Sequence, residues 1–480
     1  MNRRCFVSTL VGATALTGIT WHRCTTSRKP NFLFILVDDL GWADLGCYGS
    51  TFHETPNLDG LAATGMRFTD AYAACPVCSP TRAAIMTGRH PVRLNITDWI
   101  PGDDPHDRER IGPQDQHELP HAEVTIAEML RDNGYRTFLA GKWHLGGEGY
   151  YPEDQGFDIN KGGHEMGHPS SYYSPYRNPK LADGPEGEYL TDRLTDESIQ
   201  FLKEAGEEPF FLYLPFYTVH TPIQACKRHL QHFQEKAASL TAAMPDEREE
   251  HAGATKLRQD DAAYATMVYA MDENIGRLLR SLEELELAER TIVIFTSDNG
   301  GLSTMARNRR APTSNEPLRA GKGWCYEGGI RVPLIVRAPG ISRVASICCE
   351  PVISMDFFPT MLELAGLTVL PEKHIDGLSL VPLLRGAEQL PRDALYWHYP
   401  HYHSSTWTPG AALRARDWKL IEFFDEEKVE LYNLKEDIGE KNDLASTLPG
   451  RRDELLAELH RWQRELDAKM PTLNQNTEES

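Results

Sequence analysis

Phe32-Leu33-Phe34-Ile35-Leu36-Val37 is an unbroken apolar run, and Asp38-Asp39 follows it directly. Similar runs lie further along the chain, at Thr137–Ala140, Phe210–Phe216 and Thr291–Phe295. Short apolar runs without polar alternation are typical of strands in a sheet that is covered on both faces. We therefore expect these segments to be central strands of one sheet.

Helical patterns separate the strand-like runs. The clearest are Val124–Asn133 and the long segment Asp260–Glu289. Strands that alternate with helices predict the α/β class, with a doubly wound sheet between two layers of helices.

The chain, with 480 residues, is longer than one hydrophobic core usually supports. Its character changes after Leu364: Ala411–Arg416, Lys419–Phe424 and Val429–Asn433 alternate as antiparallel strands do, and a helix is expected from about 450 to 469. We predict a catalytic α/β domain over residues 31–370. We predict a smaller α+β subdomain over residues 371–480, built on an antiparallel sheet and contributing to the substrate pocket.

The first thirty residues resemble an export signal. Arg3 and Arg4 precede an apolar stretch that runs from Cys5 to about Thr20 without an acidic residue. The paired arginines also resemble a twin-arginine signal. Residues 1–30 therefore predict export to the periplasm or the cell surface.

Charge and hydropathy exclude other classes. The formal net charge is −20, which argues against a nucleic-acid partner because phosphate backbones need basic surfaces. After the export signal there is no apolar run of ~18 residues, so no transmembrane segment is expected.

Polar residues follow the ends of the strand-like runs. Asp38-Asp39 follows the first run, and Asp298-Asn299 follows Thr291–Phe295 closely. The carboxyl ends of parallel strands share one edge of a sheet, so the two pairs can converge there. Three carboxylates and an amide suit Ca²⁺, or less well Mg²⁺, and the absence of an imidazole or thiolate pair counts against zinc. Each Asp taken alone is equally consistent with a helix cap or a turn.

The run Cys78-Ser-Pro-Thr-Arg82 has the pattern Cys-x-Pro-x-Arg at the expected start of a helix. A helix N-terminus favours a tetrahedral anion, and Arg82 lies one turn further on. Cys75-x-x-Cys78 also allows a zinc or redox site, but no second such pair lies at zinc spacing. A buried structural thiol is the remaining alternative.

Other candidate residues stand near strand ends or in a glycine-rich loop. His144 and His220 are candidate proton carriers, because histidine titrates closest to neutral pH. Lys142 and Lys322 are candidate cations for an anionic substrate, Lys322 within Arg319–Trp324. Structural histidines and solvated surface lysines are the alternatives.

Together these elements resemble the residue set of the sulfatase family, in its usual order: Asp38-Asp39, Cys78–Arg89, Gly141–Gly146, His220, Asp298–Gly301 and Lys322. The resemblance covers roughly residues 31–335. It implies an alkaline-phosphatase-like mixed sheet sandwiched by helices. It also implies that a formylglycine-generating enzyme converts Cys78 to formylglycine, whose hydrate is the nucleophile.

The resemblance further implies roles for the matching positions. Ca²⁺ would be bound by Asp38, Asp39, Asp298, Asn299 and modified residue 78. Arg82 would stabilise the hydrate, and Lys142, His220 and Lys322 would bind the sulfate. His220 would protonate the leaving alcohol, and His144 would deprotonate the hydrate to release sulfate.

Histidine-rich aromatic segments, Gly162–His168 and Tyr396–His403, suggest a sugar pocket with His164, His168 and His401 as contacts. These aromatics could equally join the two domains. We expect an exo-acting sulfatase for a sulfated sugar of galactose or N-acetylgalactosamine type. The alternatives are a phosphonate or phosphate ester hydrolase and a catalytically dead glycan-binding protein.

Overall fold

The computed structural model describes residues 28–103, 105, 107–241 and 245–475. The expected export signal lies almost wholly outside the described residues and stays a prediction. Within the described ranges, every helix is too short or too polar to span a bilayer.

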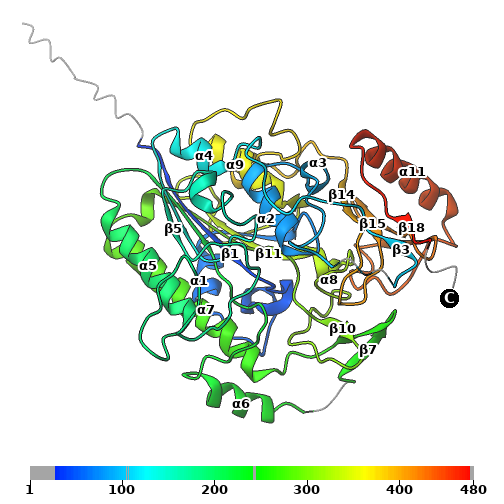
Figure 1. The fold of residues 1–480 in the computed structure, drawn as a ribbon, viewed down its shortest axis with the longest axis horizontal. Coiled ribbons are helices and arrows are strands. Elements are labelled where there is room, and N and C mark those ends of the chain that lie inside the picture. Colours follow the sequence, from blue (N-terminus) through cyan, green and yellow to red (C-terminus); the bar gives the residue numbers. More distant parts are fainter. Residues whose placement is uncertain (1–27, 104, 106, 242–244, 476–480) are drawn as a thin grey trace, which may run out of the picture.

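A mixed nine-stranded sheet forms the centre of the described structure (Figure 1). Its strands lie in the order β12 (Ser346–Cys348), β2 (Met66–Tyr72), β11 (Arg331–Arg337), β9 (Thr291–Ser297), β1 (Asn31–Val37), β6 (Phe210–Pro215), β4 (Arg136–Ala140) and β5 (Ile159–Lys161), with β13 (Val352–Ile353) beside β2. Strand β11 is antiparallel to both neighbours, whereas β1 is parallel to β6 and β9. The predicted α/β class with a mixed sheet is confirmed.

Helices cover both faces of this sheet, which explains the unbroken apolar runs. Phe32, Phe34 and Leu36 of β1 pack towards α2 (Cys78–Thr87), α4 (Ile126–Arg131), α9 (Phe357–Leu364) and α10 (Val381–Leu384). The alternate residues Leu33 and Ile35 pack towards α1 (Pro56–Thr64), α5 (Leu190–Glu204) and α7 (Ala262–Glu284). Figure 1 shows the two helix layers on opposite sides of the strands. Successive strand residues point to opposite faces, so both sets are buried.

A four-stranded antiparallel sheet lies beside the main one, in the order β14 (Leu395–Tyr399), β15 (Gly410–Ala415), β16 (Trp418–Phe423) and β17 (Lys428–Asn433). Its outer face packs on Leu455 and Leu459 of α11 (Pro449–Glu465). Its inner face joins an aromatic cluster with Trp324 and Tyr326. The expected C-terminal antiparallel sheet is therefore present, while the boundary at residue 370 stays a prediction.

Smaller elements complete the described chain. A three-stranded sheet has the order β10 (Thr304–Ala306), β8 (Gly253–Lys256) and β7 (Glu247–Glu250), and β18 (Thr472–Leu473) pairs with β3 (Arg110–Ile111). The short helices are α3 (Pro91–Leu94), α6 (Leu230–Ala238) and α8 (Glu327–Ile330), with 3-10 turns at Trp42–Asp44, Gly46–Tyr48, Pro152–Gln155, Ala288–Arg290 and Ser354–Asp356.

A buried ionic cluster connects the C-terminal sheet to the main one. Lys419 Nζ of β16 lies 2.9 Å from Glu327 Oε1 of α8 and 2.9 Å from Glu440 Oε1. Arg331 Nη1 lies 3.2 Å from Glu327 Oε2. Because all these side chains are withdrawn from water, each depends on its partners for compensation.

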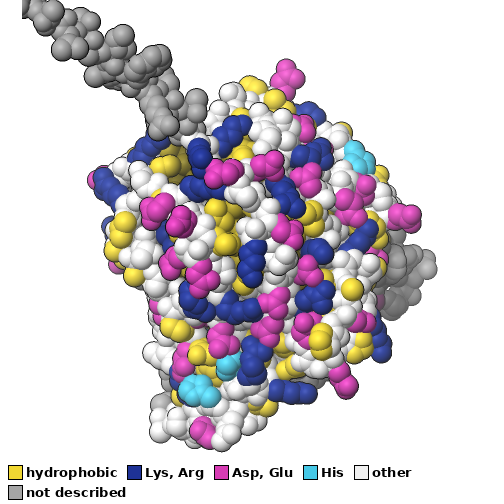
Figure 2. Space-filling view, turned by 90° about the vertical axis from the view of Figure 1, so that its left-hand side faces the viewer, with side chains coloured by type: hydrophobic (Ala, Val, Ile, Leu, Met, Phe, Trp, Pro, Cys, Tyr) yellow, Lys and Arg dark blue, Asp and Glu magenta, His cyan; other side chains and the backbone are white. Residues whose placement is uncertain are grey.

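The outer surface that faces the viewer in Figure 2 carries basic and acidic side chains interspersed with one another. The described residues on this face therefore mix the two signs of charge.

Candidate active site

Two polar pairs meet at the carboxyl ends of β1 and β9, which lie in parallel register. The backbone N–H of Asp39 donates to Asp298 Oδ1 at 3.2 Å, and Asn299 Nδ2 donates to Asp39 Oδ1 at 2.9 Å. The side chains of Asp38, Asp39, Asp298 and Asn299 are almost fully buried. The structure therefore brings all four predicted ligands together.

Two buried lysines contact these carboxylates. Lys142 Nζ lies 2.8 Å from Asp38 Oδ2, and Lys322 Nζ lies 2.6 Å from Asp39 Oδ1. Burial raises the pKa of the Asp38 carboxyl to about 8 although Lys142 opposes the shift. Burial alone would lower the pKa of Lys322, but the contact with Asp39 outweighs burial and raises it. Lys322 therefore stays charged at neutral pH.

Arg82 is the third buried cation. Its Nε and Nη2 lie 2.9 and 2.7 Å from Asp298 Oδ2, and Nη1 donates to the Lys142 carbonyl at 3.1 Å. Its Nη2 also lies 3.7 Å from Asp38 Oδ1. Arg82 thus links α2 to the ends of β9 and β4. Among the described residues, Arg82 contacts the carboxylates of Asp298 and Asp38 and not the Cys78 side chain, so it orients these carboxylates.

Cys78 is the first residue of α2, and its buried side chain faces His144. The sulfur lies 3.3 Å from His144 Nδ1, while His144 Nε2 is hydrogen-bonded to the Ile100 carbonyl. Because a carbonyl only accepts, Nε2 carries the proton and Nδ1 presents its lone pair to residue 78. Burial and then Lys142 lower the pKa of His144, and burial raises the pKa of the Cys78 thiol, so both groups are neutral.

The backbone around His144 explains the sequence Gly141-Lys-Trp-His144. A Cβ on Gly141 would stand 1.9 Å from the Pro215 carbonyl oxygen at the end of β6, so only glycine fits there. His144 has φ of 61°, as does Asp39, a left-handed conformation that costs roughly 1 kcal/mol or more in a residue with a side chain. Such conformations concentrate at functional sites.

His220 lies beyond the end of β6 and faces the same cluster. Its Nδ1 is 2.7 Å from the Thr221 carbonyl, and its Nε2 is 3.6 Å from Asp39 Oδ2. Burial and then Lys322 lower the pKa of His220 to about 3. Donor atoms of Asp38, Asp39 and His220 all lie within 4.8 Å of one another, which is close enough to share a metal ion. No imidazole was among the metal ligands predicted from the sequence.

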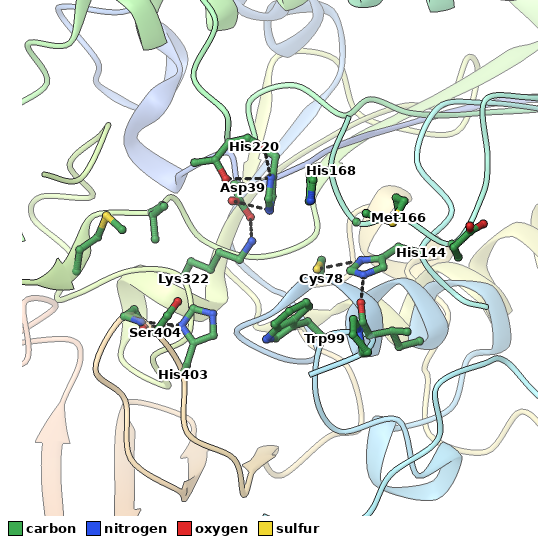
Figure 3. A pocket seen from close by; sticks show the side chains of 18 of the residues that line it. Asp39, Cys78, Trp99, His144, Met166, His168, His220, Lys322, His403 and Ser404 are labelled. Carbon is green, nitrogen blue, oxygen red and sulfur yellow. Dashed lines mark hydrogen bonds and ion pairs between the residues drawn. The ribbon is translucent and has the colours of Figure 1, made fainter. Parts of the chain in front are cut away.

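A cavity of about 510 Å³ opens above the cluster (Figure 3). Figure 3 shows Lys322 reaching towards Asp39 and the Cys78 sulfur facing His144. The cavity is lined by these four and by His220, His168, Trp99, Ile100, Pro101, Glu165, Met166, Gly167, Thr221, Leu302, Met305, Arg309, His403, Ser404 and Ser405. Arg82, Lys142 and Asp298 do not line the cavity. They lie behind its floor, where Arg82 contacts Asp298, Lys142 contacts Asp38, and Asp298 accepts from the backbone of Asp39.

Two of the three predicted sugar contacts lie elsewhere. His401 is buried, with Nε2 2.9 Å from Thr97 Oγ1, and lines a different cavity. His164 accepts the His144 N–H through its own carbonyl at 3.1 Å, and its ring contacts Glu165. His168 does line the main cavity and stacks on His220 at 6.4 Å between ring centroids. The structure therefore places His168 in the main cavity, whereas the rings of His164 and His401 lie outside it, and a sugar contact by either of them stays a prediction.

Several lining residues were not singled out from the sequence. His403 lies in the histidine-rich segment Tyr396–His403. Strand β14 ends at Tyr399, so strand alternation does not indicate which side chains beyond it face the cavity. Trp99 and Arg309 stand in loops, where no periodic pattern indicates which side chains face inwards.

Comparison with known proteins identifies the family. Residues 30–367 match the sulfatase family, and residues 320–469 match the N-sulphoglucosamine sulphohydrolase C-terminal family. The chain is 33% identical to N-acetylgalactosamine-6-sulfatase of Canis lupus familiaris over 395 residues, which cover 77% of this chain and 69% of the relative. It is 34% identical to arylsulfatase A of Homo sapiens over 410 residues, which cover 78% of this chain and 71% of the relative.

A solved structure is also similar. The crystal structure of Ps i-CgsB in complex with k-i-k-neocarrahexaose has a TM-score of 0.75 and 30% identity, covering 94% of this chain and 96% of that one. The predicted resemblance and the predicted fold are therefore confirmed: this chain belongs to the sulfatase family and is a sulfatase, a hydrolase of sulfate esters.

Proposed function

We propose that this sulfatase removes an O-sulfate from a sugar of galactose or N-acetylgalactosamine type, acting at a chain end. The observation that carries the proposal is the cavity in which Cys78, His144, Lys322 and Asp39 stand together. The name of the canine relative and the oligosaccharide in the Ps i-CgsB structure support a carbohydrate substrate. The aromatic and histidine walls suit a sugar ring, which binds through stacking and hydroxyl hydrogen bonds.

The residues at the strand ends fit a Ca²⁺ ion. Asp38 Oδ1 and Asn299 Oδ1 are buried oxygen acceptors without a hydrogen-bond donor among the described residues. Unsatisfied buried oxygens are costly, and hard oxygen ligands are those that Ca²⁺ prefers, with Mg²⁺ less suited. Asp39 and Asp298 would complete the predicted ligand set with residue 78. When bound, the ion supplies positive charge that polarises a sulfate oxygen and acidifies a hydroxyl.

The setting of residue 78 fits its proposed conversion to formylglycine. The Cys78 sulfur stands where a hydroxyl of the aldehyde hydrate would lie, beside His144 Nδ1. In the proposed enzyme one hydroxyl oxygen of the hydrate attacks the sulfur atom of the substrate's sulfate ester, and the bond from that sulfur to the sugar oxygen breaks. Loss of the proton from the second hydroxyl then expels sulfate and re-forms the aldehyde. The chain would need a formylglycine-generating enzyme as its maturation partner.

His144 is proposed as the base for residue 78. Its Nδ1 lone pair faces that side chain because Nε2 is engaged by Ile100. The lowered pKa keeps the imidazole neutral, so Nδ1 is ready to accept a hydroxyl proton.

His220 and the cations are proposed to act on the sulfate. Lys322 lines the cavity and can reach a sulfate oxygen, while Lys142 and Arg82 lie beneath and hold Asp38 and Asp298 in place. His220 can protonate the leaving alcohol only as imidazolium, which an approaching anionic substrate favours. Arg82 is therefore proposed as a positioning residue rather than a direct contact of the hydrate.

The test is sulfate release by protein produced together with a formylglycine-generating enzyme. We expect hydrolysis of 4-nitrophenyl sulfate and of 6-sulfated galactose sugars, and none by Cys78→Ala. Faster turnover of an aryl phosphonate than of the aryl sulfate would favour the phosphonate hydrolase alternative. Sugar binding without sulfate release by the wild type would favour the catalytically dead alternative.

We also propose that the enzyme works after export, in the periplasm or at the cell surface. The basis is the paired arginines and the apolar stretch at the start of the sequence. Amino-terminal sequencing of the protein from its host would detect removal of about the first thirty residues.

A further inference from the structure

A basic loop forms one wall of the cavity. It follows β10 and contains Arg307-Asn-Arg309-Arg310. The backbone N–H of Arg309 donates to the Ala306 carbonyl at 2.9 Å, which closes a turn. Since β10 pairs with β8 along its length, the base of this loop is fixed. Met305 and Arg309 line the cavity.

The neighbouring arginines are engaged elsewhere. Arg307 Nη2 lies 3.3 Å from Glu249 Oε1, and Arg310 Nη2 lies 3.3 Å from Asp260 Oδ1. Among the described residues, the Arg309 side chain has no ion pair or hydrogen bond. Arg309 is exposed, and an arginine side chain is charged at any physiological pH, so this is a solvated cation at the cavity without a partner among the described residues.

The other charged groups around the cavity have partners. Lys322 Nζ lies 2.6 Å from Asp39 Oδ1, and both side chains are buried at the floor of the cavity. Glu165 on the wall accepts from the Tyr151 hydroxyl at 3.1 Å. In a chain with a net charge of −20, Arg309 is thus a local positive charge. Its field reaches about a Debye length of 8–10 Å before salt screens it.

We propose that Arg309 recognises a second anionic group on the substrate, a sulfate ester or a uronate carboxylate. The proposal rests on the proposed sugar sulfatase function. The sulfate to be cleaved lies at the floor beside residue 78, and the second anion lies at the wall. A guanidinium presents paired donors that match either anion. A cavity of about 510 Å³ accommodates more than a single sulfate group. The substrate class is therefore a polyanionic saccharide.

Kinetics on matched disaccharides test this. One galactose-containing disaccharide carries a single sulfate ester, a second carries another sulfate on the neighbouring ring, and a third carries a uronate there. We expect wild-type kcat/KM to be about 10-fold higher for a dianionic substrate, the gain from a charge-assisted hydrogen bond. Arg309→Ala should reduce that ratio to about 1 through KM. Arg309→Lys should retain part of the preference for a dianionic substrate, because lysine keeps the positive charge but lacks the paired donors of the guanidinium.

Arg307→Ala is the matched control, since Arg307 faces Glu249 and lies outside the cavity. It should leave the ratio as in the wild type. Comparison of kcat/KM for the disulfated and the uronate-containing disaccharides shows which second anion is preferred. An unchanged ratio in Arg309→Ala, or an equal loss on all three substrates, would overturn the inference.

Binding separates this inference from the proposed reaction. In the Cys78→Ala background, calorimetry measures affinity for the disulfated disaccharide without turnover. Adding Arg309→Ala should weaken that affinity about 10-fold, even if the wild type releases no sulfate. Equal affinity with and without Arg309 would contradict the inference whatever the outcome for turnover.

Discussion

Nδ1 of His144 lies 3.3 Å from the Cys78 sulfur, and the opposite ring nitrogen is hydrogen-bonded to the Ile100 carbonyl. The imidazole is therefore held in one tautomer, with its lone pair directed at the residue that is proposed to become the nucleophile. This relationship joins the end of β4 to the start of α2, two segments that are far apart in the sequence.

His144→Ala is expected to lower kcat about 100- to 10,000-fold, which is the usual contribution of a positioned proton carrier. KM should change little, because Lys322 still binds the sulfate. The measurement is steady-state hydrolysis of 4-nitrophenyl sulfate by fully matured protein. His117→Ala, at an exposed position, is the control. A fall of less than about 10-fold in kcat would argue against a role in proton transfer.

Calcium should stabilise the protein as well as support turnover. At a concentration 100 times its dissociation constant, a ligand that binds only the native state adds about 2.7 kcal/mol to the free energy of unfolding. We expect chelation to lower Tm and added Ca²⁺ to restore it. Asp298→Asn should abolish this calcium-dependent shift.

Asp272→Asn is the control for the calcium experiment. Asp272 is a buried carboxylate that accepts from the Leu58 N–H at 2.8 Å in α1, away from the strand-end cluster. This variant should lose stability but keep the calcium-dependent shift. A wild-type Tm that responds to neither chelator nor Ca²⁺ would contradict the proposed metal site.

The buried ionic cluster between the two sheets should be intolerant of truncation. Lys419→Met leaves Glu327 and Glu440 without their shared partner and is expected to cost about 3–5 kcal/mol. Lys428→Met removes a half-exposed lysine whose partner Glu430 is buried but keeps the Tyr326 and Tyr432 hydroxyls as donors, so it should cost only about 1 kcal/mol. Urea denaturation compares the two. Similar losses in both variants would show that burial of this cluster is unimportant.

Stability should fall as the pH drops from about 6.5 towards 4. His398 Nε2 lies 2.9 Å from the Lys469 carbonyl, and burial lowers the pKa of His398 to about 4. Between that value and the unfolded value near 6.5, the unfolded chain binds a proton that the native protein does not. This histidine's contribution is complete above about pH 6.5 and is lost on acidification, by up to roughly 3 kcal/mol.

The corresponding variant is His398→Gln, followed by thermal melts from pH 7 to pH 4. We expect a lower Tm at pH 7 but a shallower decline with acid than in the wild type. His117→Gln should follow the wild-type curve. An identical slope for His398→Gln and the wild type would exclude this histidine as a source of acid sensitivity.

The sequence could predict the parts of the site that depend on strand ends. Asp38 and Asp298 follow strands β1 and β9, and neighbouring parallel strands bring such positions together in any α/β sheet. Cys78 and Arg82 share one helix, so their relationship is local. In these cases the element itself fixes the geometry.

The cavity walls could not be predicted in this way. His401 and His403 are two residues apart, yet the first packs on Thr97 while the second lines the cavity. Likewise Arg309 faces the cavity and Arg307 faces Glu249. Loop side chains take their direction from tertiary contacts, and no sequence period records those contacts.

The chemical identity of residue 78 is the most direct test of the account. Tryptic cleavage after Arg67 and Arg82 gives a peptide that holds both Cys75 and Cys78, so fragmentation must locate any change. In protein from its native host we predict a loss of about 18 Da at position 78, the change from a thiol-bearing CH₂ to an aldehyde, with Cys75 unaltered. An unmodified thiol at position 78 in that protein would contradict the proposed formylglycine mechanism.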